Sequence, residues 1–524
     1  MRSNTGLGMA PTLCSRCGDA VDEGCDPKDE LAELNTLLKR LKLKRYDLKR
    51  KINRFHSPII HHLPPDVTST IFEFCLPKFS DHQLLKENLS IPLLLGAICS
   101  YWRDIAWSTP SLWSSMVLHV SSRHDSHIIP GIAKEWLSRS GHLPLSIRIF
   151  SISKNKTLSR LADIINQYST RWSDLVRNIP DFYYQRFHAS DTHAPILKSI
   201  QFRITAFDSE LMDLNFQLTC PRLERACLSF FTMDGTNIQW DNLTHLTLYF
   251  MSYIDSFIIL RKTPRLVFCE ISGGCPGYGV QGIVGGIEAV VLTSLRSLRI
   301  RVTTSADGYL NNIVAPHLEE FSVPKYYNPP MEVITSFFRR SACPLRSFSM
   351  AFRSFSPHFE RFMNSFQSMN TVTLSIISIT ETACYSKNIA PEDYDPRNIL
   401  QLVAKVLSSQ STSLQQGFLP NLKILEYTGM LRVPSGNLDA LYALPPADNA
   451  VRGPLHLFKL NLHPITRIPK KMMSYFSSLE ERGVTVNVLS KSKDILQSSI
   501  DYYRSREESL YRDWADNLDS SLFS

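Results

Sequence analysis

One short apolar phrase recurs along most of the chain and constrains its fold more than any other feature. The phrase is L-x-x-L-x-L, loosely kept, and its first eight copies start at intervals of 20 to 29 residues. Its last two apolar positions alternate as on a β-strand, and its first approaches the core from the preceding turn. The ten copies are Leu197-Ile200-Phe202, Leu223-Ala226-Leu228, Leu243-Leu246-Leu248, Leu266-Cys269-Ile271, Leu295-Leu298-Ile300, Leu318-Phe321-Val323, Leu345-Phe348-Met350, Met369-Val372-Leu374, Leu422-Leu425-Tyr427 and Leu455-Phe458-Leu460. This repetition explains a length of 524 residues, which is too long for one compact core.

The spacing of the phrase resembles that of leucine-rich repeats, whose period is about 20 to 29 residues. In four copies a proline stands two residues before the first Leu, where it can end a helix and start an extended segment: Pro221, Pro264, Pro316 and Pro420. The resemblance implies an α/β solenoid over 121–490, with parallel strands on its concave face and helices outside. The asparagine ladder of regular repeats is missing, so we expect an irregular array. The alternative is a generic α/β domain with parallel strands, and we favour the solenoid because ten copies are hard to obtain by accident.

Helices are expected between and after the copies. Residues 331–340 carry Val333, Ile334, Phe337 and Phe338 on one side of a helix. Residues 375–418 are expected to hold a long polar surface loop followed by a helix over 399–407. Near the end of the chain we expect a helix over 472–482, a C-cap at Gly483 and a strand over 484–488. The segment 491–524 is expected to cap the array with a polar helix over 494–514.

Residues 57–120 form a separate apolar segment. Pro64 and Pro65 suit the first turn of a helix, and apolar residues then recur at helical spacing over a stripe wider than one amphipathic face needs. Leu93, Leu94 and Leu95 begin a second helix of the same kind. A module of roughly 50 residues is too small to bury all these side chains itself, which implies a partner surface.

The order of the motifs in this segment resembles an F-box. The motifs are Leu63-Pro64, Ile71-Phe72, Cys99 three residues before Trp102-Arg103, and the closing Pro110-Ser111-Leu112-Trp113. The resemblance implies binding of the small Skp-type adaptor that links F-box proteins to a cullin-RING ubiquitin ligase. The resemblance also implies an adaptor-binding role for seven residues: Leu63, Pro64, Ile71, Phe72, Ile98, Cys99 and Trp102. The polar insertion 78–90 departs from the short turn usual in F-boxes, and the alternative is an ordinary helical hairpin packed on the rest of the protein.

Residues 27–56 form a basic helix with a heptad pattern, and 1–26 is expected to be a flexible tail. The apolar positions are Leu31, Leu34, Leu38, Leu41, Leu48, Ile52 and Phe55, with Arg45 interrupting the seam. The helix can pair with another chain or lie along the rest of its own chain. We expect docking within the chain, because the seam is marginal for a stable coiled coil.

The same helix carries the net charge of the protein. Residues 39–54 hold nine Lys and Arg against Asp47 alone, a surplus of eight, and the whole chain has a formal net charge of +8. The rest of the chain therefore balances to zero, and the basic character gives no general indication of nucleic-acid binding. The run can be a nuclear-localisation signal or a phosphate-binding face, but a solvated helix surface is the commoner explanation.

Motifs for catalysis or metal binding are weak. Cys14, Cys17 and Cys25 lack a nearby fourth ligand for zinc, and the GYGVQG stretch at 277–282 lacks the helix and acidic residue of a dinucleotide site. We therefore expect no metal, no cofactor and no enzymatic activity. The eleven scattered cysteines, the lack of a signal-peptide core and the lack of a membrane-spanning run favour a cytoplasmic or nuclear protein.

Taken together, these features predict the substrate-recognition subunit of a Skp-cullin-F-box ubiquitin ligase, with the solenoid holding an unidentified target protein. A scaffold that binds proteins without ubiquitination is the second hypothesis. A nucleic-acid-associated protein acting through residues 39–54 is the third, and an enzyme built around the glycine-rich loop is the last.

Overall fold

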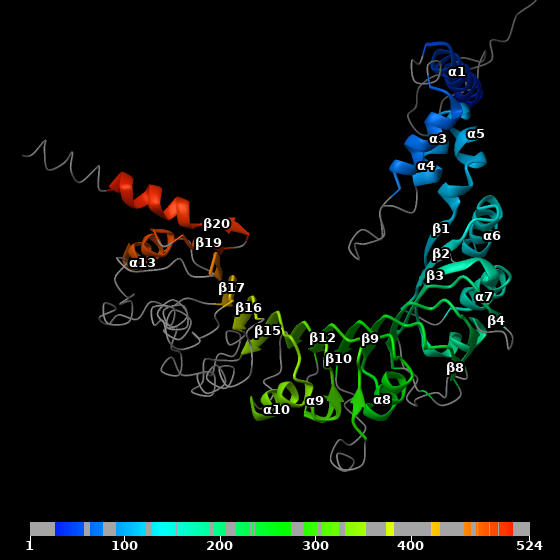
Figure 1. Cartoon of the computed structure of the whole chain (residues 1–524). Coiled ribbons are helices and arrows are strands. Elements are labelled where there is room, and N and C mark those ends of the chain that lie inside the picture. Colours follow the sequence, from blue (N-terminus) through cyan, green and yellow to red (C-terminus); the bar gives the residue numbers. More distant parts are fainter. Residues whose placement is uncertain are drawn as a thin grey trace, which may run out of the picture. The chain divides into compact units, whose positions relative to one another are not determined.

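The structure of the chain is a computed structural model (Figure 1) in which two compact units are distinguished, residues 1–116 with 135–143 and residues 117–134 with 144–524. We describe each unit by itself. The residues described are 27–56, 63–76, 91–121, 128–152, 155–187, 192–205, 216–230, 233, 236–273, 288–301, 307–323, 331–352, 374–381, 421–429, 455–462, 468, 470–481, 483–490 and 492–506.

The first unit is helical. Its elements are α1 (Pro27–His56), α3 (Pro65–Phe74), α4 (Ile91–Ile98), α5 (Ser100–Ser108), the 3₁₀ turn η2 (Pro110–Trp113) and the last part of α6 (Ile129–Arg139). Helix α3 begins at the proline pair, as predicted. Proline is tolerated there because the N–H that it lacks would have no partner within the first turn of the helix. Helix α5 begins after Cys99, whose Sγ accepts a hydrogen bond from the Trp102 N–H at 3.4 Å.

Most of the described strands form one fifteen-stranded sheet. From β2 to β19 each strand is parallel to its neighbour, and only the short β20 is antiparallel to β19. In spatial order the strands are β1 (Ser115–His119), β2 (Leu145–Phe150), β3 (Trp172–Ile179), β5 (Ser199–Ile204), β7 (Arg225–Ser229), β9 (His245–Tyr249), β10 (Phe268–Ser272), β12 (Ser297–Arg301), β14 (Glu320–Val323), β15 (Ser347–Phe352), β16 (Ile376–Glu381), β17 (Ile424–Gly429), β18 (Leu457–Leu462), β19 (Thr485–Ser490) and β20 (Lys493–Asp494). The spatial order follows the chain order, as expected when repeated units stack on one another.

The register of this sheet brings equivalent positions of the apolar phrase side by side. Cys269 lies between Leu246 and Leu298, and all three side chains are buried. In ten units the Leu that precedes the strand is also buried: Leu197, Leu223, Leu243, Leu266, Leu295, Leu318, Leu345, Leu374, Leu422 and Leu455. The predicted array of α/β repeats with parallel strands is therefore confirmed at this level.

A recurrent turn brings the first Leu into the core. The N–H of Leu243 donates to the carbonyl of Trp240 at 3.0 Å, and the N–H of Leu266 donates to that of Thr263 at 3.2 Å. The same hydrogen bond, from the Leu N–H to the carbonyl three residues earlier, is made by Leu197, Leu223, Leu295 and Leu318. The turn satisfies a backbone donor while the chain changes direction, so the Leu side chain is buried without an unpaired N–H beside it.

The segments between the long strands are more varied than predicted. Short parallel strands precede several copies, as β4 (Thr192–His193), β6 (Phe216–Thr219), β8 (Thr236–Ile238), β11 (Val290–Val291) and β13 (Ile313–Val314). Helical segments occupy other connections, as α7 (Thr157–Asn166), η4 (Ser169–Arg171), η5 (Asp181–Tyr183), η6 (Gln185–Phe187), α8 (Tyr253–Arg261), α9 (Asp307–Asn312), α10 (Met331–Ser341) and α13 (Lys470–Glu481). In Figure 1, α8, α9 and α10 lie on one side of the sheet.

Helix α10 shows how a connection packs on the sheet. Phe337 and Phe338 are buried, as the helical spacing predicted, and their ring centroids lie 5.6 and 5.2 Å from that of Phe321 on β14. Phe321 in turn stacks on Phe348 of β15 at 6.1 Å. The apolar row of the strands therefore faces this helix, and the alternate residues lie on the opposite, open face of the sheet.

One copy of the phrase was assigned to the wrong register. Met369 and Val372 are outside the described residues, and Leu374 occupies the buried first position, followed by Ile377 and Ile379 on β16. The prediction of a surface loop from residue 375 is consequently wrong over 376–381. The pattern was misleading because Met369 and Val372, five and two residues before Leu374, complete the phrase equally well.

Other expectations near the ends of the array are confirmed in part. Gly483 has φ of +83° after α13, as expected of a C-cap, and β19 follows directly. A helix spans 496–506, inside the predicted 494–514. The predicted helix over 399–407, the glycine-rich stretch 277–282, the insertion 78–90 and the N-terminal tail lie outside the described residues.

The division into buried and open faces of the sheet can be tested at neighbouring positions of β14. Phe321→Ala is expected to lower the free energy of unfolding by about 3–5 kcal/mol, because it removes a buried ring contacted by three others. Ser322→Ala, on the open face, is expected to change it by less than about 0.5 kcal/mol. Guanidinium denaturation followed by circular dichroism measures both, and equal shifts of the midpoint would show that the faces are assigned wrongly.

Candidate protein-interaction surfaces

The interior of the helical unit is built from aromatic rings on different helices. Phe72 of α3 is fully buried, and its ring meets that of Trp102 of α5 edge to face with centroids 4.9 Å apart. Trp102 is half-buried. These rings hold α3 against α5, so the two helices present fixed outer faces.

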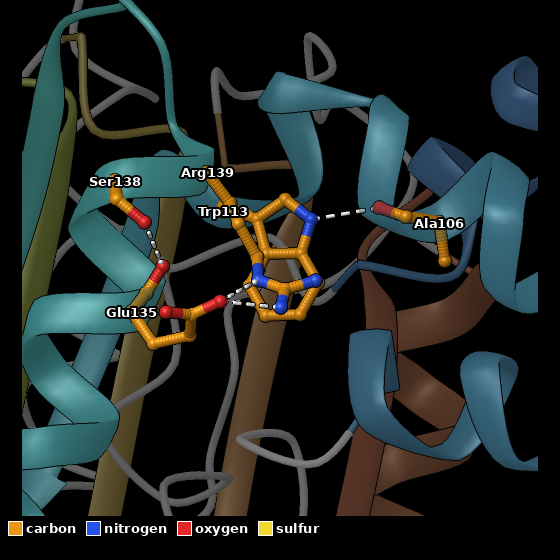
Figure 2. A network of polar contacts seen from close by, with 5 residues as sticks. All are labelled: Ala106, Trp113, Glu135, Ser138 and Arg139. Carbon is orange, nitrogen blue, oxygen red and sulfur yellow. Dashed lines mark hydrogen bonds and ion pairs between the residues drawn. The ribbon is translucent and has the colours of Figure 1, made fainter.

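Polar contacts hold Trp113 at the end of the predicted F-box segment (Figure 2), and its ring belongs to a second aromatic cluster. The indole N–H of Trp113 donates to the Ala106 carbonyl at 2.7 Å, and the ring meets Trp136 of α6 at 4.8 Å. The Arg139 guanidinium lies 5.1 Å from the Trp113 ring centroid and pairs with Glu135 at 2.5 Å. The closing Pro110–Trp113 turn is thus held by residues 135–143, a contact that the sequence did not reveal.

A glycine sets the spacing of α4 and α5. Gly96 is buried, and a Cβ added there would come within 1.9 Å of the Trp107 ring. Since no real Cβ approaches a ring so closely, only glycine lets these two helices lie at this distance. Trp107 also contacts Trp113, at a centroid distance of 5.3 Å.

Helices α3 and α4 leave a set of large apolar side chains exposed, which we call the α3/α4 apolar surface. On α3 the residues are three or four apart and share a helix face, and on α4 two of them are four apart. Their exposed fractions range from 41 to 84%, and they are Val67, Ile71, Phe74, Leu93, Leu94 and Ile98. Exposed aliphatic and aromatic groups of this kind make the two helices a candidate protein-interaction surface.

The seven residues carried over from the F-box resemblance divide between this surface and the interior. Ile71 and Ile98 belong to the α3/α4 apolar surface, and Pro64 is exposed. Leu63, Cys99 and Trp102 are half-buried. Phe72 is fully buried, so in this structure its ring supports the fold and is not available to a partner.

Sequence reasoning missed part of this surface. Phe74, Leu94, Val67 and Leu93 were seen as members of over-wide apolar stripes but were not named as contact residues. Phe74 is the most exposed of the set, at 84%. The excess width of the stripes was the signal that could have identified them, since residues beyond the packed face must point outward.

The open face of the long sheet is polar and forms a second candidate surface. The Arg203 guanidinium lies 4.4 Å from the ring centroid of Tyr249, two strands away. Arg301 Nε lies 3.3 Å from a carboxylate oxygen of the mostly buried Glu270. Burial raises the pKa of the Tyr249 phenol, which therefore keeps its proton at neutral pH. This face offers charges of both signs and hydrogen-bonding groups on rigid strands.

Three cysteines in the described part of the repeats have raised thiol pKa values. Burial raises the pKa of Cys220 and Cys269 to about 12 and that of Cys227 to about 11. Thiols with such pKa values are protonated at neutral pH, and the thiolate is the form that attacks electrophiles or binds metals. The buried Cys220 and Cys269 act as small apolar side chains, and Cys269 packs between Leu246 and Leu298 of the neighbouring strands.

Within the described part of the chain, no group of three or more His, Cys, Asp or Glu side chains is arranged to hold a metal ion. No described helix has the length and apolar character needed to cross a membrane. Cys14, Cys17, Cys25 and the 277–282 stretch lie outside these residues, so their predicted lack of a metal or nucleotide role stays a prediction.

Comparison with known proteins identified no family for this chain. No protein-family model matches the chain, and no curated protein matches it in sequence. The F-box and leucine-rich-repeat resemblances therefore remain predictions from the motifs and their spacing.

The tight contact at Gly96 gives a direct test of the helical unit. Gly96→Ala is expected to lower the free energy of unfolding by about 1–3 kcal/mol, because the new methyl group overlaps Trp107 and forces α4 away from α5. Gly131→Ala is the matched control, because a Cβ there meets nothing within 4 Å and alanine favours a helix by up to about 1 kcal/mol. Thermal unfolding followed by tryptophan fluorescence separates the two. A Gly96 variant as stable as the control would contradict the α4–α5 packing.

Proposed function

We propose that this chain is a non-catalytic substrate-recognition subunit of a Skp-cullin-F-box ubiquitin ligase. The α3/α4 apolar surface would bind the Skp-type adaptor, and the open face of the long sheet would hold the target protein. The chain would contribute proximity and orientation, while the catalytic residues would belong to other subunits.

The observation that carries the proposal is the exposed apolar surface on a helical unit whose interior is already filled. Phe72, Trp102 and Trp113 complete the packing between the helices, so the exposed Ile71, Leu94 and Ile98 are not needed to hold the fold. Full burial of an aliphatic side chain of this size contributes about 1.5–3 kcal/mol. A few such residues supply the hydrophobic centre typical of a stable protein interface.

The F-box resemblance supplies the identity of the partner. Ile71 and Ile98 are among the residues to which it gives an adaptor-binding role, and both are exposed. Because Phe72 is buried, we remove it from the set of residues proposed to contact the adaptor. Its packing instead places Ile71 on the outer side of α3. The order of motifs from Leu63 to Trp113 and the shared apolar surface point to the same partner.

The long sheet suits the role of target binding because its strands are rigid and its open face is chemically varied. Arg203, Tyr249, Glu270 and Arg301 offer cationic, aromatic and anionic groups on neighbouring strands. Repeat arrays commonly use such extended faces to bind proteins. The chemistry of this face does not select one target class.

A scaffold that binds proteins without ubiquitination is the second candidate. It uses the same sheet face but makes no use of an adaptor, so adaptor binding separates the two functions. The α3/α4 apolar surface favours the ligase subunit, because a scaffold acting only through the sheet leaves that surface without a role.

Co-purification of the full chain with a Skp-type adaptor from the same source organism tests the proposal. The wild-type chain is expected to form a stoichiometric complex, and Ile71→Asp combined with Ile98→Asp is expected to weaken binding at least about 100-fold, as loss of two central apolar contacts does. Isothermal titration calorimetry gives the dissociation constants.

The control for this experiment is Ile152→Asp, which places the same charge at an isoleucine that is 83% exposed in the other unit. Circular dichroism and thermal unfolding show whether each variant is folded. A folded double variant that binds the adaptor as well as the wild type would place the adaptor interface elsewhere. Absence of any complex with the folded wild-type chain would leave the scaffold function ahead.

A further inference from the structure

Helix α1 has no packed face along its described side chains. Every side chain from Glu30 to Ile52 is exposed, and the aliphatic residues among them have exposed fractions between 49 and 67%. The prediction that this helix docks within its own chain is therefore wrong for these residues. A helix of 30 residues is about 45 Å long, so it leaves a long apolar stripe uncovered.

The stripe follows a heptad pattern, with basic residues along both of its edges. Its core positions are Leu31, Leu34, Leu38, Leu41, Arg45, Leu48 and Ile52. The flanking positions, which face the flanks of a partner helix in a coiled coil, hold Lys42, Lys44, Lys49 and Lys51 over the second half of the seam. A seam whose second half is bordered by lysines on both sides is suited to a partner with carboxylates at the matching positions.

A second copy of this chain does not meet that requirement. In a parallel pair in register, Lys44 faces Lys49 of the other copy and Arg45 faces its own equivalent in the core. In an antiparallel pair centred on residue 43, Lys42 and Lys44 each face their own equivalents, and Arg45 packs beside Leu41. Both arrangements place like charges together along helices that each carry a surplus of eight positive charges over residues 39–54.

Lipid and nucleic acid fit the stripe less well than an acidic helix does. On an anionic membrane the apolar stripe is the part that enters the hydrocarbon, and Arg45 would enter with it. A nucleic acid engages the basic side chains but leaves the leucine seam in water. Only an acidic helix covers the seam and also places a carboxylate opposite Arg45.

We propose that α1 forms a heterotypic coiled coil with an acidic amphipathic helix of another protein. The partner presents apolar residues to the leucine seam, glutamates to the flanking lysines and a carboxylate to Arg45. This interaction is independent of adaptor binding, because the α3/α4 apolar surface takes no part in it.

The test uses the full chain and two synthetic peptides of about four heptads. Both have leucine and isoleucine in the core. The acidic peptide has Glu at the flanking positions and opposite Arg45, and the basic peptide has Lys at all of these positions. Fluorescence anisotropy is expected to show the acidic peptide binding about 100-fold more tightly, because like charges oppose the basic one.

Variants of the seam and a control outside it test whether the peptide binds to the leucine seam. Leu38→Asn with Leu41→Asn is expected to weaken binding of the acidic peptide at least about tenfold, as polar groups at core positions weaken coiled coils. Leu43→Asn is the matched control, because Leu43 is as exposed but lies off the seam, and it is expected to bind like the wild type. Arg45→Glu is expected to prefer an acidic peptide that has a single Lys opposite residue 45, which would identify the core charge as part of recognition.

Several results would overturn the proposal. Equal binding of the acidic and basic peptides would remove the role of charge, and an unaffected seam variant would remove the role of the leucines. Sedimentation showing a dimer of the full chain that Leu38→Asn with Leu41→Asn dissociates would make a second copy the occupant. Binding to phosphatidylserine vesicles or duplex DNA, without binding to the acidic peptide, would assign the helix to those ligands.

Discussion

The burial of one leucine just before the strand, seen at ten strands from β5 to β18, is the constraint on which the repeat unit depends. Six of these side chains, from Leu197 to Leu318, are brought inward by a turn whose backbone bond joins the Leu N–H to the carbonyl three residues earlier. The strand that follows then starts in the same register as its neighbour, and its alternate apolar side chains fall into two continuous rows. The buried leucine, the turn before the strand and the register of the strand therefore depend on one another. The segments that connect one strand to the next can vary in length and structure.

The helical unit shows how a filled interior determines what remains outside. Ile71 and Phe72 are neighbours in sequence, but consecutive helix residues point about 100° apart, so packing Phe72 on Trp102 turns Ile71 outward. Gly96 has a comparable effect on α4, since the close approach of Trp107 fixes which side of that helix faces α5. The apolar surface proposed to bind the adaptor is thus a consequence of the aromatic packing beneath it.

The sequence was most informative where a pattern repeats and least informative where one side chain breaks it. Nine of the ten phrases were placed in the correct register, including those with the small Ala226 and the weakly apolar Cys269 at core positions. Strand β3 was missed, because the fully buried Arg177 lies at the position where Phe202 stands in the next repeat. No periodicity of apolar residues reveals a strand whose buried position is charged.

The candidate site was predictable in location but not in detail. An over-wide apolar stripe predicted that α3 and α4 present an apolar surface, yet it could not predict the rotation of either helix about its axis. That rotation is set by contacts between distant residues, such as Phe72 with Trp102 and Trp113 with Trp136. The helices that carry the surface were therefore predictable from the sequence, whereas its individual residues follow from the packing.

The segregation of charge into α1 has a consequence for the colloidal behaviour of the whole protein. Outside residues 39–54 the acidic and basic side chains cancel, so the repulsion that keeps copies apart in solution comes from one helix. A protein with a net charge near zero tends to associate and precipitate. Any ligand that neutralises α1 would leave the copies without mutual repulsion, so occupancy of this helix would also control the solubility of the chain.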